Sequence, residues 1–211
     1  MATLLHLRSS ADTRTSTSRA IGDAFVAAWD ERDDHRVVVR DLHRDPLPHI
    51  ADGSLHWPAR LRPADAGSFP EAEALQSELI EELVAADALL VEAPMYNWSL
   101  PSSLKAWIDF VHVPGVTAPF DEPTQPLAGR TAVVVSSRGG AYEPGTPTAY
   151  ADHTLPPLRL LLGEMFGMRV ETIVAELTLA RAGLALTERA DDSRAQLDAA
   201  LARAAELGAI V

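Results

Sequence analysis

The chain contains no cysteine, so disulfides, thiolate nucleophiles and cysteine metal ligands are all excluded. It has only one lysine, Lys105, and its 18 basic residues are outnumbered by 30 acidic ones, which gives a formal net charge of -12. Binding to a phosphate backbone needs clustered basic side chains. Nucleic acid is therefore not an expected partner.

Long apolar segments are also absent. No stretch approaches the roughly 18 apolar residues of a membrane span, and residues 4–7 are too short for the apolar part of a signal peptide. We therefore expect a soluble protein of the cytoplasm without a membrane partner. His43, His49 and His56 lie in one irregular region, but they form no H-x-x-x-H pair, so we expect no metal site.

What the sequence does contain is a regular alternation of short apolar runs and helical patterns. The runs that indicate strands cover residues 2–7, 35–41, 88–91, 130–136 and 169–175, and the helical patterns cover 18–28, 71–86, 101–111, 150–168 and 187–207, with Gly208 as the last stop signal. Five alternations without a repeat predict an α/β fold: a doubly wound five-stranded parallel sheet in the order 2-1-3-4-5, with helices on both faces.

The hydrophobic content of 47% is sufficient for one sizeable core, so we expect one domain over residues 1–211. Two stretches rich in proline fit neither a strand nor a helix, residues 42–69 and 112–129. We expect both to be excursions at the surface.

A loop of unusual composition, Pro94-Met-Tyr-Asn-Trp-Ser99, follows the third apolar run. In an open parallel sheet, ligands bind beyond the carboxyl ends of the strands, which is where this loop would lie. Met, Tyr and Trp side chains offer polarizable, stackable surface, and Asn97 carries a donor and an acceptor, which suits a flat heteroaromatic ring. The alternative is that Tyr96 and Trp98 are core aromatics in an ordinary turn.

The first strand is followed by a loop rich in hydroxyl groups that runs to Ser18, the expected cap of the first helix. Free amide groups at a helix N-terminus together with Ser and Thr hydroxyls form a cradle for a phosphate. Because the loop lacks the sequence patterns of nucleotide and dinucleotide loops and has no lysine, it suits a monophosphate. A polar turn that only caps the helix is an equally good interpretation of this segment alone.

The fourth strand is followed by Ser137-Arg-Gly-Gly140. Paired glycines let backbone amides approach the edge of a planar ring closely and take positive φ, so these residues could donate hydrogen bonds to the polar edge of such a ring. By themselves, the two glycines are better explained as a plain turn.

These three motifs, in this order over residues 4–140, resemble the FMN-dependent NADH azoreductases, a branch of the flavodoxin-like quinone reductases. The resemblance covers the phosphate loop, the Pro94–Trp98 loop with the following Leu100-Pro-Ser-Ser-Leu-Lys-Ala-Trp-Ile-Asp109, and the second flavin loop. It implies a flavodoxin-like fold and FMN as cofactor. The residues it assigns to the cofactor are Ser10, Ser16, Thr17, Ser18, Pro94, Met95, Tyr96, Asn97, Trp98, Ser137, Arg138, Gly139 and Gly140.

The resemblance also implies a catalytic set of Asn97, Gly139, Gly140 and Tyr142, and a substrate pocket formed by Trp98, Phe120, Tyr142 and Leu162. It implies a homodimer with the helix from Pro101 and the 112–129 segment near its interface. The chain departs from the family pattern at Ala118, where members often carry an aromatic residue, at Tyr142, where they often carry histidine, and at Leu162. The Ala118 departure concerns the choice of substrate rather than flavin binding, and Tyr142 can donate a hydrogen bond but cannot carry a positive charge.

The function that follows is an FMN enzyme that takes a hydride from NADH or NADPH and delivers two electrons to a small aromatic acceptor, a quinone or azo compound, by a ping-pong mechanism. The alternative is a flavodoxin-type electron carrier that docks on a protein partner, which the charge of -12 would suit. The two long excursions argue against a small carrier. A Ser/His/Asp hydrolase is excluded because no G-x-S-x-G motif is present.

Overall fold

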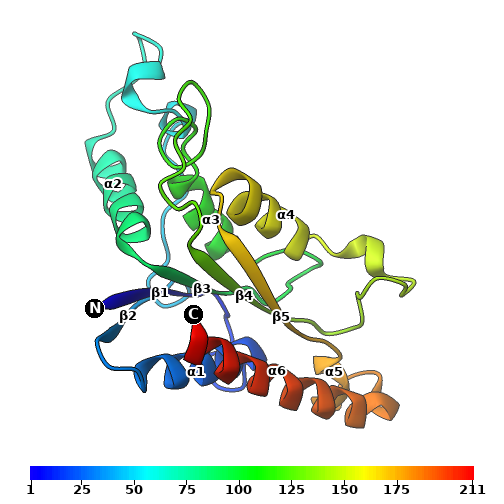
Figure 1. The fold of residues 1–211 in the computed structure, drawn as a ribbon. Coiled ribbons are helices and arrows are strands. Elements are labelled where there is room, and N and C mark those ends of the chain that lie inside the picture. Colours follow the sequence, from blue (N-terminus) through cyan, green and yellow to red (C-terminus); the bar gives the residue numbers. More distant parts are fainter.

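The computed structural model describes residues 1–211 and contains one five-stranded parallel sheet (Figure 1). The strands are β1 (Ala2–Arg8), β2 (His35–Asp41), β3 (Ala88–Glu92), β4 (Thr131–Ser137) and β5 (Arg169–Ala175). Their order in the sheet is β2-β1-β3-β4-β5. The predicted strands and the predicted order are therefore confirmed, and the strand ends differ from the prediction by one residue at most.

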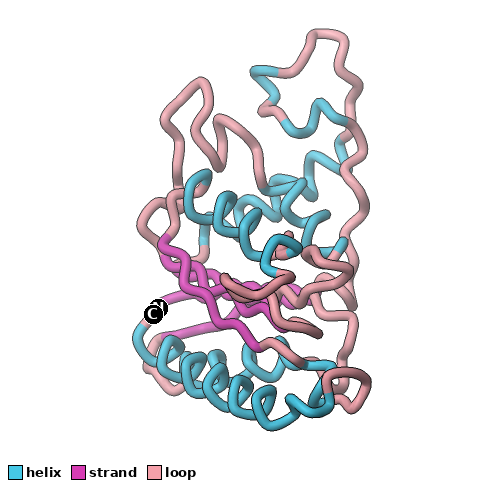
Figure 2. The backbone as a smooth tube through the Cα atoms, turned by 90° about the vertical axis from the view of Figure 1, so that its right-hand side faces the viewer, coloured by secondary structure: helices cyan, strands magenta, loops and turns pink.

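Helices cover both faces of the sheet (Figures 1 and 2). The helices on one face are α1 (Thr17–Asp30), α5 (Thr178–Arg181) and α6 (Ala190–Ile210), and those on the other are α2 (Pro70–Ala85), α3 (Ser102–Val111) and α4 (Leu155–Arg159). A π-helical segment, Leu160–Met165, continues α4. No helix is both long and apolar enough to cross a membrane.

The sheet separates two hydrophobic cores, and neighbouring residues of each strand alternate between them. Leu5 and Leu7 of β1 belong to the core beneath α2, α3 and α4, whereas Leu4 belongs to the core beneath α1 and α6. Val133 and Val134 of β4 divide between the cores in the same way. Successive side chains of a strand point to opposite faces, so a strand that is covered on both faces must be apolar throughout, as these runs are.

Several helix ends differ from the prediction. Helix α1 begins at Thr17 with Ser16 as its cap, not Ser18, and α3 begins at Ser102, directly after Pro101. The helix predicted from residue 150 begins only at Leu155. Helix starts commonly vary by one or two residues, which covers α1 and α3. Before α4, residues Ala149–Ala151 instead form a separate 3-10 turn, and the Asp152 carboxylate accepts from the Thr154 and Leu155 amides at 2.9 and 3.1 Å.

Gly208 does not end the last helix, which continues to Ile210. A Cβ atom at this position would lie 2.3 Å from the carbonyl oxygen of Phe25 in α1. The glycine is therefore required by the close approach of α6 to α1 rather than by a helix stop. Sequence reasoning also missed α5, which is only four residues long.

The two predicted excursions contact each other on the α2 and α3 side of the sheet (Figure 1). The rings of Trp57 and Phe120 lie 5.0 Å apart, and the Arg60 guanidinium pairs with Asp121 at 2.8 Å. Residues 42–69 include two short 3-10 turns, Gly53–His56 and Ala59–Leu61. Leu55 of this excursion is buried, so the segment is fastened to the molecule rather than extended into solvent.

Candidate active site

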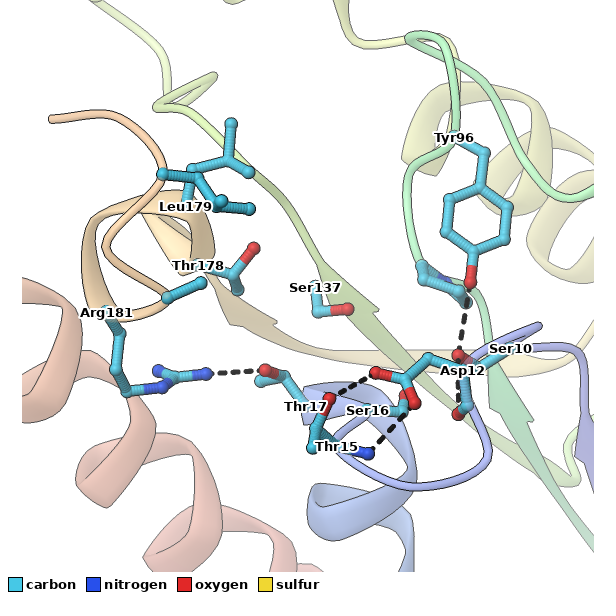
Figure 3. Close-up of a pocket in the computed structure, with 13 residues that line it drawn as sticks. Ser10, Asp12, Thr15, Ser16, Thr17, Tyr96, Ser137, Thr178, Leu179 and Arg181 are labelled. Carbon is cyan, nitrogen blue, oxygen red and sulfur yellow. Dashed lines mark hydrogen bonds between the residues drawn. The ribbon is translucent and has the colours of Figure 1, made fainter.

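A cavity of about 500 Å³ lies at the carboxyl ends of the strands (Figure 3). It is lined by residues of the three motifs and of the segment after β5: Ser10, Asp12, Thr15, Ser16, Thr17, Pro94, Tyr96, Ser137, Thr178, Leu179, Arg181, Ala182 and Leu184. The carboxyl ends of parallel strands meet at one edge of the sheet, which explains how motifs more than 120 residues apart come together.

One end of the cavity is the N-terminus of α1. The Ser16 hydroxyl accepts a hydrogen bond from the Arg19 amide at 3.3 Å, while the amides of Thr17 and Ser18 have no acceptor in the chain. The Ser18 side chain is fully buried and lies 3.1 Å from the Ser16 hydroxyl, so it supports the cap and does not face the cavity. Free amides and hydroxyls at a helix N-terminus are the donors that an anion site needs.

Asp12 shapes the loop that leads into α1. Its carboxylate accepts hydrogen bonds from the Thr15 hydroxyl at 2.5 Å and from the amides of Thr15 and Arg14 at 2.9 and 2.8 Å. The bonds from Thr15 lower the pKa of Asp12 to about 2, and the bond from Arg14 adds to them. The carboxylate is therefore ionised at neutral pH and holds the loop in a tight turn.

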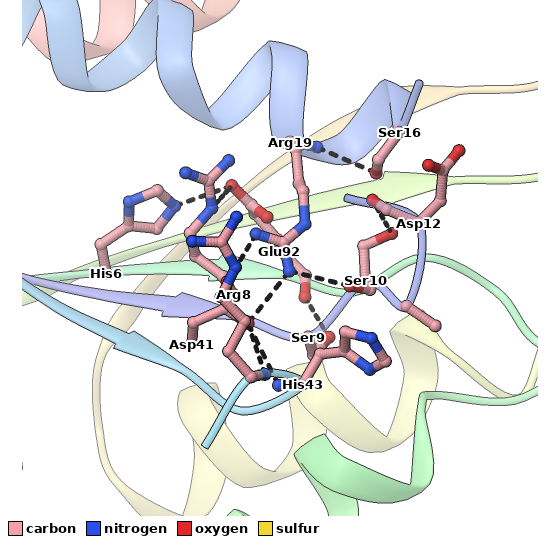
Figure 4. Close-up of polar contacts among 12 residues, drawn as sticks. His6, Arg8, Ser9, Ser10, Asp12, Ser16, Arg19, Asp41, His43 and Glu92 are labelled. Carbon is pink, nitrogen blue, oxygen red and sulfur yellow. Dashed lines mark hydrogen bonds and ion pairs between the residues drawn. The ribbon is translucent and has the colours of Figure 1, made fainter. Parts of the chain in front are cut away.

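A buried arginine ties this loop to the end of β2 (Figure 4). The Arg19 guanidinium donates to both carboxylate oxygens of Asp41, at 2.7 and 3.0 Å, and to the carbonyl of Ser10 at 2.8 Å. Burial alone would raise the pKa of Asp41, but the Arg19 bonds and two backbone amides lower it to about 2. A bidentate pair of this kind fixes orientation as well as charge, so the position of Ser10 is well defined.

A second buried network joins the ends of β1 and β3 below the cavity (Figure 4). The Glu92 carboxylate is fully buried, 2.8 Å from His6 Nε2 and 3.3 Å from Arg8 Nε. The Ser9 hydroxyl donates to the Glu92 carbonyl. The phosphate loop after β1 and the loop Pro94–Ser99 after β3, here called the ring loop, therefore start from strand ends that these hydrogen bonds hold together.

The ring loop turns back on itself at Tyr96–Ser99. The Tyr96 and Ser99 amides each donate to the other residue's carbonyl, at 2.9 and 3.1 Å, and both central residues are left-handed, with φ of 49° at Asn97 and 66° at Trp98. Positive φ at both central positions is the pattern of a type I′ turn. A bulky residue such as Trp98 is strained in this conformation, and such strain concentrates at functional sites.

The ring loop contacts the phosphate loop directly. The Tyr96 hydroxyl accepts a hydrogen bond from the Ala11 amide at 3.0 Å and lies 3.2 Å from the Ser10 hydroxyl. Trp98 has 56% of its surface exposed, so it does not fill the core as one alternative required, and Trp107 takes the inward position. Asn97 and Tyr96 also line a second hollow of about 730 Å³ next to α3.

The glycine pair after β4 differs from the prediction in one respect: neither Gly139 nor Gly140 has positive φ. Their amides have no acceptor in the chain, and their carbonyls accept from the amides of Leu179 and Leu177 at 3.3 and 3.1 Å. A Cβ atom at Gly139 would lie 3.0 Å from the Leu179 side chain. The segment after β5 therefore packs closely against the loop, and a side chain at position 139 would have to displace Leu179.

Arg138 was expected to contact the cofactor, but its guanidinium is buried in ion pairs. It lies 2.9 Å from Asp152 and 3.2 Å from Glu176, and the Glu176 carboxylate also accepts from the Tyr142 amide at 2.6 Å. Burial raises the pKa of Glu176, while the Tyr142 amide and Arg138 oppose the rise. Arg138 therefore holds the loop from behind, and it lines a separate hollow together with Tyr142.

Two residues expected in the substrate pocket lie elsewhere. Leu162 is buried in the core beneath α4, 1% exposed, and lines neither hollow, so we withdraw it from the pocket. A leucine on an apolar helix face usually belongs to the core, and no pattern around Leu162 indicates otherwise. Phe120 packs on Trp57 and does not line the cavity of its own chain.

Sequence reasoning missed the wall that follows β5, formed by Thr178, Leu179 and Arg181. The Arg181 guanidinium donates to the Thr17 hydroxyl at 2.6 Å, across 164 positions of the chain. No motif marks this segment. Its position after a strand of a parallel sheet was the only signal that could have indicated it.

These residues fit FMN. The cavity volume is typical of cofactor sites. Its α1 end offers unpaired amides and hydroxyls to a phosphate, and its other end offers the side chain of Tyr96 and the hydroxyl of Ser137 to a larger group. The unpaired amides of Gly139 and Gly140 lie next to Leu179, which lines the same cavity.

Comparisons with known proteins agree with this geometry. A family model described as a flavodoxin-like fold matches residues 2–207. The crystal structure of an azoreductase from Bacillus anthracis str. Sterne superimposes with a TM-score of 0.81 over 100% of both chains, at 21% identity. At that identity the match shows that the fold is shared.

Two relatives are much closer in sequence. An FMN-dependent NADH:quinone oxidoreductase of Kineococcus radiotolerans is 49% identical over 205 residues, which covers 97% of each chain. One of the same name from Streptomyces avermitilis is 41% identical over 218 residues, 98% of this chain and 97% of the relative. Identity at this level over the whole length establishes a family, and the chain belongs to the flavodoxin-like FMN-dependent NADH:quinone oxidoreductases.

Proposed function

We propose that this protein is an FMN-dependent oxidoreductase that takes a hydride from NADH or NADPH and delivers two electrons to a quinone, azo compound or related aromatic acceptor. The observation that carries the proposal is a single cavity with an anion cradle at one end and the Tyr96 loop at the other. Relatives that are 41% and 49% identical are named for the NADH:quinone activity. We assign this activity to a single domain over residues 1–211, acting in the cytoplasm.

When bound, FMN supplies the hydride acceptance and electron delivery. The chain binds and orients the group. The hydroxyls of Ser10, Ser16 and Thr17 and the free amides of Thr17 and Ser18 hold the phosphate, where the α1 dipole favours negative charge. Asp41, through Arg19, keeps Ser10 in place.

At the ring end, Pro94, Met95, Tyr96 and Trp98 form the apolar and aromatic wall of the proposed site. Ser137 contributes a hydroxyl that lines the cavity. The Tyr96 and Trp98 rings would hold the flavin ring by aromatic contact.

We assign the catalytic role to Asn97, Gly139, Gly140 and Tyr142. The free amides of Gly139 and Gly140 would donate hydrogen bonds to the polar edge of the ring and favour negative charge there. The backbone N–H of Asn97, which has no acceptor in the chain, lies in the strained turn. Tyr142 brings a hydroxyl in place of the imidazole of other members, so it donates a hydrogen bond without carrying a positive charge.

One cavity must admit the nicotinamide donor and the aromatic acceptor in turn, which is the basis for the proposed ping-pong order. Phe120 is 62% exposed and does not line the cavity of its own chain, so a role in the substrate pocket would require a partner chain. We therefore include a homodimer with α3 and residues 112–129 at its interface. A light-scattering mass near that of one 22.7 kDa chain would contradict the dimer.

The test uses the purified protein. We expect a yellow protein that releases FMN in mild acid and oxidises NADH with a small quinone when no second protein is present, which an electron carrier would not do. Initial rates at several quinone concentrations should give parallel double-reciprocal lines if the order is ping-pong. A colourless protein that takes up no added FMN would refute the proposal.

A further inference from the structure

Arg181 lines the phosphate end of the cavity, where Figure 3 shows its contact with Thr17, and a second contact with Ser193 holds it from the other side. One nitrogen donates to the Thr17 hydroxyl at 2.6 Å, and the other lies 3.3 Å from the Ser193 hydroxyl and 3.4 Å from its carbonyl. The guanidinium is thereby oriented toward the first residue of α1, although it comes from the opposite end of the chain.

Arg181 takes part in none of the ion pairs of the structure. The two arginines that hold the loops of the cavity, Arg19 and Arg138, are each paired with carboxylates. Burial lowers the pKa of Arg181, and no acidic group offsets this effect. The side chain remains charged at neutral pH. A half-buried cation without a counter-ion is unfavourable unless an anion binds beside it.

We propose that Arg181 is a cofactor-binding residue that supplies the positive charge of the phosphate cradle, so that the chain selects flavin carrying a phosphomonoester over flavin without one. The inference rests on the proposed function. The Arg181 guanidinium lies beside a hydroxyl-lined cradle that contains no lysine. Its contacts also connect Thr17 of α1 with Ser193 of α6.

The experiment titrates the flavin-free, full-length protein with FMN and separately with riboflavin, and follows the quenching of flavin fluorescence. A hydrogen bond to a charged group supports a loss of about 10- to 100-fold in FMN affinity for Arg181→Gln, with riboflavin affinity unchanged. Arg181→Lys should retain most of the preference for FMN. Added salt should weaken FMN binding by the wild-type protein more than by Arg181→Gln.

Arg169→Gln is the matched control. Arg169 also donates to a threonine hydroxyl, that of Thr131 at 3.2 Å, but it lies at the amino end of β5, at the opposite edge of the sheet. Its substitution should change neither affinity. Equal losses of FMN and riboflavin affinity in Arg181→Gln would mean that Arg181 only packs α5, and would overturn the proposal.

The 2′-phosphate of NADPH is also a phosphomonoester, so it is the other ligand group that Arg181 could bind. Holoenzyme with Arg181→Gln should keep the wild-type ratio of KM values for NADPH and NADH. A change in that ratio with unchanged FMN affinity would assign Arg181 to the dinucleotide and overturn the proposal. If the wild-type protein binds neither flavin, the proposed function fails first, and that result is distinguishable from a failure of Arg181 alone.

Discussion

The ring end and the phosphate end of the cavity each depend on an arginine, but the two side chains are satisfied in opposite ways. Arg138 follows Ser137 in a motif and is 3% exposed between two carboxylates. Arg181 belongs to no motif, and its hydrogen-bond partners are neutral. The paired cation fixes a loop, whereas the unpaired one is free to meet an anion. Whether an arginine supports a loop or binds a ligand therefore depends on whether carboxylates already neutralise its charge, not on whether it lies in a motif.

The two arginines are also mechanically linked. The segment that carries Arg181 lies along the loop Ser137–Gly140 that follows β4. Its backbone amides donate to three carbonyls of that loop: Leu177 to Gly140, Thr178 to Arg138 and Leu179 to Gly139. A loop displaced at the ring end would therefore move the phosphate end as well. Substitutions that remove one arginine at a time separate the two roles.

The largest effect is expected for Arg138→Met. Removing the guanidinium leaves the carboxylates of Glu176 and Asp152 buried without a counter-ion, which costs about 3 kcal/mol or more of unfolding free energy. Chemical denaturation measures the loss. Arg203→Met is the control, because Arg203 also contacts two carboxylates, those of Glu171 and Glu206, but at the surface, so little stability should be lost.

The Arg138→Met deficit should depend on pH. Burial raises the folded-state pKa of Glu176 above its ordinary value of 4.5, so its contribution to stability is full below that value and is lost as pH rises through the folded pKa. Without Arg138 the pKa should rise further. The deficit relative to wild type should then shrink as pH falls from 7 toward 4.5. A deficit that is constant with pH would show that Arg138 acts by packing instead.

The sequence was sufficient for the sheet because its signals are local. Runs such as Val133–Val135 must be apolar when helices cover both faces, and the alternation with helices then sets the strand order. The three motifs were assigned to one site by their resemblance to a known family, since the phosphate loop alone is equally well explained as a turn and the glycine pair alone better so. The carboxyl edge of the sheet then brings them together. The cap at Ser16 was placed two residues late because several hydroxyl side chains in a row can each cap a helix.

The rest depended on partners that are distant in sequence. The carboxylates that occupy Arg138 lie 14 and 38 positions away, and Thr17, which Arg181 contacts, lies 164 positions away. Nothing in a linear pattern ranks such pairs. The glycine pair was assigned positive φ because glycine permits it. In the structure neither glycine has positive φ, and Gly139 instead lies against the Leu179 side chain, which a Cβ would approach to 3.0 Å.

A smaller effect is expected for Trp98→Ala at the ring end. The ring is largely exposed at the tip of a strained turn, so its loss should reduce flavin or acceptor affinity about tenfold, roughly 1.4 kcal/mol, and leave the melting temperature almost unchanged. FMN dissociation, quinone KM and the thermal midpoint are measured on the same variant. The contrasting variant, Trp107→Ala, removes a ring that is 1% exposed and should lower the midpoint sharply. The reverse pattern would contradict the assignment of Trp98.

The smallest effect is expected at the phosphate end, for Ser16→Ala. The hydroxyl accepts from the Arg19 amide and lines the cavity, so its removal should cost about 1 kcal/mol of unfolding free energy and weaken FMN binding while riboflavin binding is retained. Ser18→Ala is the matched variant, because Ser18 contacts Ser16 but neither caps α1 nor lines the cavity. It should affect FMN affinity less. If Ser18→Ala weakens FMN more than Ser16→Ala does, the buried hydroxyl orders the cradle, and the cap is secondary for phosphate binding.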